Sequence, residues 1–155
     1  MAHAAISDYD QLDELVTAMR SSADIRSTYL RDAVASASPT HLLVMLYDRL
    51  LLDLRWAEEA QLAEDWHAAS VRLIHAQDIL AELTSTLNPA IWDGGNALMS
   101  LYLFVARLMR TANVSHDVGR TLECIDLLEP LRLAWHAAAD QVATATEQPR
   151  ISAVG

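Results

Sequence analysis

The feature that most constrains the fold is an unbroken apolar stripe between residues 66 and 87. Its members alternate in spacing between three and four residues, as side chains on one face of an α-helix do. They are Trp66, Ala69, Leu73, Ala76, Leu80, Leu83 and Leu87. A half-buried strand would need an apolar residue at every second position instead. The spacing therefore predicts a long helix that packs against other helices in a bundle.

Three further segments show helical periodicity. One begins at Ser38-Pro39, a capping hydroxyl followed by proline at the first helical position, and runs to about Leu62. Asp65 and Asp117 stand where they can cap the second and fourth helices. The expected core stripes of the first, third and fourth helices are Leu43, Leu46, Leu50, Leu54 and Ala57; Leu98, Leu101, Val105, Leu108 and Ala112; and Val118, Leu122, Ile125, Leu128, Leu131, Trp135 and Ala138.

Glycine and proline fall mostly between these segments, and short connections favour antiparallel neighbours. The sequence predicts an all-α chain: an antiparallel four-helix bundle with a short N-terminal helical extension. We expect the extension and capping segment at residues 1–37, the bundle at 38–140 and a polar, disordered tail at 141–155. Pro130 lies inside the fourth helix, so we expect a kink there or a helix split in two.

Charge and composition restrict the partners. The 21 acids outnumber the 11 bases, all of which are arginine, and the net charge of -10 repels nucleic acid and anionic membranes. No apolar run reaches the roughly 18 residues of a membrane span, and the N-terminus lacks the basic start of a signal peptide. These features predict a cytoplasmic protein without membrane insertion. The single cysteine, Cys124, lies in an apolar helical stretch and is interpreted as a buried thiol.

Catalytic and metal-binding patterns are weak. A di-metal bundle needs two Glu-x-x-His pairs, and the chain has one, Glu64 to His67, which straddles a predicted loop. A histidine phosphotransfer bundle usually has a lysine and a glycine just after its histidine, and this chain has no lysine. Phosphate loops and nucleophile elbows are also missing. We therefore expect no enzyme activity, no cofactor and no metal.

The bundle has more apolar surface than its core requires. Only Ser100 and Arg107 interrupt the apolar run from Leu98 to Met109, and a helix that is apolar all round is normally covered all round. Several apolar side chains point outside the core stripes: Met45, Leu52, Val71, Ile74, Met99, Leu103 and Phe104. They predict a groove for an amphipathic helix of a partner protein. Cover by loops, by the N-terminal segment or by a second copy stays open as an alternative.

Ordered motifs then indicate a family. Residues 29–39 place a tyrosine ten residues before the proline of a Ser-Ala-Ser-Pro turn, and residues 41–48 contain a leucine pair that leads into Met-Leu-Tyr-Asp. Residues 76–83, Leu101-Tyr102, Ala112-Asn113 and 131–135 follow in order. From Tyr29 to Ala139 the chain resembles the flagellar export chaperone family FliS, although that family usually has glycine where Arg49 stands.

The resemblance implies a cytoplasmic chaperone that binds the C-terminal, helix-forming segment of flagellin. It would prevent premature polymerisation and deliver flagellin to the flagellar export gate. Tyr29 joins the expected partner-binding residues. We expect residues 8–37 to fold back over the groove in the absence of partner, through Leu12, Leu15, Val16, Met19 and Ile25. A homodimer, or a signalling or structural bundle whose apolar faces serve only self-association, is the competing interpretation.

Overall fold

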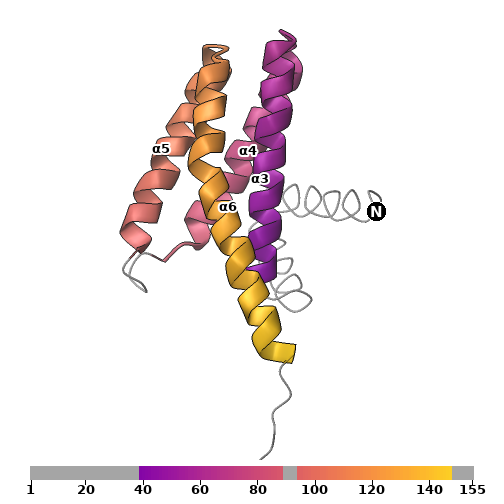
Figure 1. Ribbon diagram of the computed structural model, residues 1–155. Helices are drawn as coiled ribbons and strands as arrows, with labels where there is room; N and C mark the ends of the chain where they lie inside the picture. Colours follow the sequence, from indigo (N-terminus) through magenta and orange to yellow (C-terminus); the bar gives the residue numbers. More distant parts are fainter. Residues whose placement is uncertain (1–38, 89–93, 148–155) are drawn as a thin grey trace, which may run out of the picture.

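The computed structural model describes residues 39–88 and 94–147, which form four α-helices and no strand. With the labels of Figure 1, they are α3 (Pro39–Leu62), α4 (Trp66–Thr86), α5 (Gly95–Val114) and α6 (Val118–Glu147). Successive helices run in opposite directions (Figure 1). Within these residues no helix combines the length and hydrophobicity needed to cross a bilayer. The predicted all-α bundle is confirmed.

The four helices surround one core. α3 contacts α4 and α6, and α5 contacts the same two neighbours from the other side, although less extensively than α3. Most predicted stripe residues are buried, among them Leu50, Leu54, Leu73, Leu80 and Leu128. The prediction of the core from helical spacing is therefore largely confirmed for α3 and α4.

Two of the predicted caps hold the ends of the helices. The backbone N–H of Ala68 donates to the carboxylate of Asp65 at 3.1 Å, and that of Gly119 donates to Asp117 at 3.0 Å. Both bonds satisfy donors that the first turn of a helix leaves without a partner. The cap predicted at Ser38 lies outside the described residues.

The inward face of the first half of α6 differs from the prediction. Leu122, expected in the core, is 40% exposed, and Thr121 and Cys124 are buried in its place. The Thr121 hydroxyl donates to Gln61 Oε1 at 2.6 Å, and Gln61 Nε2 donates to the carbonyl of Ala112 at 3.1 Å. A stripe assigned from hydrophobicity alone missed this buried polar link, which joins α3, α5 and α6 and satisfies its own polar groups.

α6 also differs in length and continuity. It passes through Pro130 as one helix, so the predicted split is wrong, whereas Figure 1 shows the lower half leaning away from the line of the upper half, as a proline kink would make it. The helix continues beyond residue 140, the expected end of the bundle, because residues 131–147 contain neither glycine nor proline. The Thr144 hydroxyl, which donates to the carbonyl of Asp140 at 2.8 Å, lies in this last part.

A buried charge cluster, which the apolar stripes did not predict, joins α3 to α4. The Asp53 carboxylate is 0% exposed and accepts hydrogen bonds from Arg49 Nε at 3.2 Å and Arg72 Nη1 at 3.4 Å. His75 Nδ1 also contacts this carboxylate. Both guanidinium groups lie over the Trp56 ring, at 5.2 Å for Arg49 and 4.2 Å for Arg72. The negative charge of Asp53 is thus compensated inside the bundle, as a buried charge requires.

Candidate functional site: an apolar groove between α5 and α6

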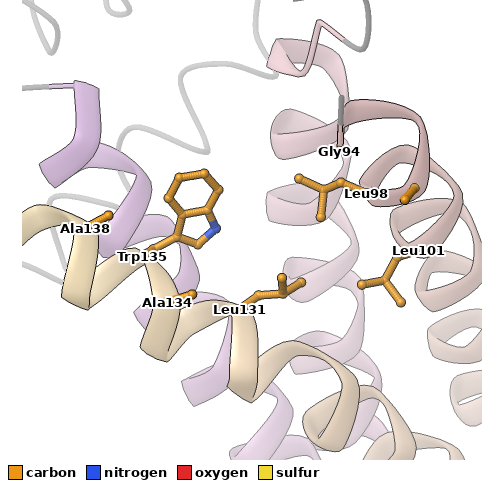
Figure 2. A pocket seen from close by; sticks show the side chains of 8 residues that line it. Gly94, Leu98, Leu101, Leu131, Ala134, Trp135 and Ala138 are labelled. Atoms are coloured by element: carbon orange, nitrogen blue, oxygen red, sulfur yellow. The ribbon is translucent and has the colours of Figure 1, made fainter. Parts of the chain in front are cut away.

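An apolar groove of about 460 Å³ lies between the first half of α5 and the second half of α6. Figure 2 shows Leu131 and Trp135 reaching from α6 toward Leu98 and Leu101 of α5. Small residues leave the space between these larger side chains. The full lining is Gly94, Ala97, Leu98, Leu101, Leu131, Ala134, Trp135 and Ala138.

The helical repeat explains why these residues share the groove. On α5, Ala97 and Leu101 are four positions apart, so their side chains lie above one another on the edge that faces α6. On α6, Leu131, Ala134 and Ala138 repeat at three and four positions and form the opposite wall. Alanines in both walls leave the space between the larger side chains unfilled, so two core stripes open into a surface groove.

Trp135 joins the groove to the interior of the bundle. Its indole packs against the buried ring of Tyr47, with ring centroids 6.4 Å apart and planes tilted by 46°. Within the described residues, the buried indole N–H of Trp135 has no hydrogen-bond partner. The Tyr47 hydroxyl contacts the hydroxyl of Tyr102, which is also buried. A chain of three aromatic side chains therefore runs from the groove through α3 to α5.

These tyrosines add no charge to the site. Burial raises the pKa of Tyr47 above its usual value, although hydrogen bonding with Tyr102 opposes the shift. Burial, with the hydrogen bond between Tyr102 and Tyr47 as a second cause, raises the pKa of Tyr102 as well. Both hydroxyls stay neutral at physiological pH, and the groove lining has no titratable side chain. The site can bind apolar side chains, and it has no group that could act as a general acid or base.

The other candidates for chemistry are placed elsewhere. Cys124 is buried, as predicted, and burial raises the pKa of its thiol to about 12, with a smaller contribution from the charge of Glu123. Such a thiol is not a nucleophile near neutral pH. His67 and Glu64 are both exposed. Within residues 39–88 and 94–147, no three His, Cys, Asp or Glu side chains are grouped to hold a metal ion.

The residues predicted to bind a partner fall on several faces. Val71 and Ile74 of α4 are exposed, as are Leu103 and Phe104 of α5, so their outward orientation is confirmed. Met45, Leu52 and Met99 are half-buried, and Met45 packs against the core. None of these seven lines the groove. Tyr29 and the predicted cover, Leu12, Leu15, Val16, Met19 and Ile25, lie outside the described residues.

The groove residues were named from the sequence, but as core. Leu98, Leu101, Leu131, Trp135 and Ala138 all belong to predicted core stripes, and helical periodicity gives no sign that two stripes diverge. The exposed alanines Ala97 and Ala134, which widen the groove, carry no pattern of their own. The signal that pointed near this site was the apolar run of α5.

The fold and the groove define a four-helix bundle with an apolar groove on its surface, and comparisons with known proteins identify its family. The sequence model of the family described as "Flagellar protein FliS" matches residues 21–142. The "Flagellar secretion chaperone FliS" of Bacillus subtilis (strain 168) is 31% identical over 112 residues, which cover 72% of this chain and 84% of that protein.

A solved structure, "Crystal structure of flagellar chaperone from bacteria", shares the fold. Its TM-score is 0.62 at 21% identity, and the match covers 76% of this chain and 97% of the other. The chain belongs to the FliS family of flagellar secretion chaperones. As a member it is a non-enzymatic cytoplasmic protein that binds flagellin for export.

Proposed function

We propose that the α5/α6 groove holds the C-terminal, helix-forming segment of flagellin. The observation that carries this proposal is an apolar groove on the surface of a bundle that belongs to a family of flagellar secretion chaperones. An amphipathic segment folds when its apolar side chains find such a surface. The groove volume of about 460 Å³ is within the range of about 300–1,000 Å³ typical of ligand pockets.

Burial of apolar side chains supplies the binding free energy. A leucine transferred from water into a groove such as this contributes about 1.5–3 kcal/mol. Ordering a disordered segment opposes this gain, so several anchors are needed for stable binding. Leu98, Leu101, Leu131 and Trp135 offer apolar contact on both walls. The bound segment would be withheld from polymerisation because its apolar face is covered.

The same proposal includes the later steps of export. The chaperone delivers flagellin to the flagellar export gate, and residues 8–37 cover the groove when no flagellin is bound. The support for a cover is the stripe Leu12, Leu15, Val16 and Met19, which matches an apolar groove in character. A homodimer through the groove would compete with both occupants.

Filling the groove tests the proposal. Ala134 lines the groove and is exposed, so Ala134→Trp would occupy the space without leaving a cavity in the core. Ala137, also exposed and on α6, lies outside the lining and makes Ala137→Trp a matched control. We expect Ala134→Trp to weaken binding of a flagellin C-terminal peptide at least tenfold and Ala137→Trp to change it less than twofold, measured by titration calorimetry.

Circular dichroism and light scattering complete the experiment. Both variants should keep the helicity and molar mass of the parent. Equal affinities for the two variants would place the peptide on another surface. A parent dimer that Ala134→Trp converts to a monomer, with no loss of peptide affinity, would assign the groove to self-association instead.

A further inference from the structure

The outer face of α5 carries positive charge in a strongly acidic protein. Among the four described helices, α5 is the only one without an aspartate or a glutamate, and it contains Arg107 and Arg110. The chain as a whole has a net charge of -10. A local positive surface is therefore unusual in this molecule.

These two arginines also differ from the others by their surroundings. The structure describes seven arginines, and five of them form ion pairs: Arg49, Arg55, Arg72, Arg120 and Arg132. Arg107 and Arg110 are exposed, and neither forms an ion pair with residues 39–88 or 94–147. Their guanidinium groups are thus available to carboxylates from outside the bundle.

Apolar side chains flank the two arginines on the same face. Leu103, Arg107, Arg110 and Val114 are spaced four, three and four residues apart, so they form one stripe along α5. Leu103 is 53% exposed and Val114 83%. At about 100° per residue this stripe lies opposite the buried residues Leu98, Val105 and Ala112. It is therefore separate from the α5/α6 groove.

A second hollow adjoins the stripe on its α4 side. A groove of about 450 Å³ between α4 and α5 is lined by Leu103, Ala106 and Arg110 from α5. Ala81, Thr84, Ser85 and the carboxylate-bearing Asp78 contribute from α4. The hollow gives an incoming side chain an apolar contact beside Arg110.

We propose that this outer stripe of α5 binds an acidic amphipathic helix of a partner protein. Two carboxylates three or four residues apart on that helix would meet Arg107 and Arg110, and its apolar side chains would cover Leu103 and Val114. Guanidinium groups pair with carboxylates through charge-assisted, often bidentate hydrogen bonds. Residues three or four apart are neighbours on a helix, which matches the spacing of the two arginines.

The rest of the surface favours this occupant over polyanions. A nucleic acid or an anionic bilayer presents an extended array of negative charge and would meet the acidic helices on either side of α5. A single helix can approach α5 along its length and leave those neighbours in water. Since the two surfaces of α5 are distinct, a cargo segment in the α5/α6 groove and an acidic helix on the stripe would bind at the same time.

The test uses the full chain and a synthetic 18-residue peptide with a leucine stripe flanked by glutamates. Matched peptides carry glutamine or lysine in place of the glutamates. We expect fluorescence polarisation to show that the double variant Arg107→Glu/Arg110→Glu has at least tenfold lower affinity for the glutamate peptide than the parent protein. The double variant should bind the lysine peptide instead. Arg120→Glu is the control, because Arg120 is also exposed but already paired with Glu123 at 2.9 Å. It should change the affinity less than threefold.

Other outcomes would overturn the proposal. If the glutamine and glutamate peptides bind with the same affinity, the arginines do not select acidic helices. If phosphatidylserine vesicles bind the parent protein but not the double variant, the surface binds a bilayer. A dimer that the double variant converts to a monomer would make a second copy the occupant. Circular dichroism checks that the double variant is folded, which we expect because both side chains are exposed.

Discussion

Replacing the buried carboxylate at the α3/α4 interface should destabilise the bundle severely. Asp53 is fully buried and compensates the charges of Arg49, whose side chain is 4% exposed, and of Arg72, and it also contacts His75. In Asp53→Asn the Arg49 guanidinium keeps its charge but loses its buried counter-charge. Removing one partner of a buried pair costs about 3–5 kcal/mol. Since a domain is stable by only about 5–15 kcal/mol, this is a large part of the total.

A matched substitution on the same helix gives the comparison. Asp48 accepts hydrogen bonds from Arg132 Nε at 2.6 Å and His136 Nε2 at 2.7 Å, at the rim between α3 and α6. The Arg132 and His136 side chains are 30% and 37% exposed, so water screens these pairs. Asp48→Asn should therefore cost about 1 kcal/mol or less.

Urea unfolding, followed by circular dichroism, measures the loss of unfolding free energy in each variant. An unchanged slope of this free energy against urea concentration is the check for two-state behaviour. The double variant Arg49→Met/Asp53→Asn should be no less stable than Asp53→Asn, because it no longer buries a guanidinium group beside a neutral side chain. A loss below 1 kcal/mol for Asp53→Asn, or equal losses for Asp53→Asn and Asp48→Asn, would refute the view that Asp53 neutralises a buried charge.

Two further predictions concern the core thiol and the N-terminal segment. Because burial raises the pKa of Cys124 to about 12, iodoacetamide at pH 8 should leave the thiol of the native protein unmodified and should alkylate it in urea. Mass spectrometry measures the rate of alkylation. Alkylation of the native protein as fast as that of the unfolded protein would contradict the burial of Cys124. Removal of residues 1–24 should tighten binding of a flagellin C-terminal peptide in calorimetry, because a cover reduces the binding-competent fraction; unchanged affinity and unchanged molar mass would show that the segment is not a cover.

The secondary structure could be predicted because the repeat of α4 is uninterrupted. Five of its seven stripe residues are buried, namely Ala69, Leu73, Ala76, Leu80 and Leu83, and the two at its ends, Trp66 and Leu87, are half-buried. Asp65 caps the helix where the sequence placed the cap. In these segments the local signals of spacing and capping agree with tertiary packing. Ordered motifs along the chain, rather than any single residue, indicated the family.

Features that depend on two helices at once could not be predicted. Periodicity assigned Leu122 to the core because leucine is apolar. The structure buries Thr121 instead, since its hydroxyl donates a hydrogen bond to Gln61 of α3. Only the fold shows that Asp53, four residues after Arg49 on the same helix, lies against it inside the bundle. Such contacts depend on how the helices pack together, and the spacing of residues in the sequence does not predict them.

The apolar run of α5 is explained by three different surfaces of one helix. Leu98, Tyr102 and Val105 face the interior, where Tyr102 meets Tyr47. Ala97 and Leu101 face α6 and form one wall of the groove, so part of what the sequence presents as core lines a surface groove. Leu103 and Val114 face away from the bundle on either side of the arginine pair. A helix that is apolar all round therefore requires neither complete burial in its own bundle nor a single large interface: one face of α5 lies in the core, one forms a wall of the groove with α6, and one is exposed.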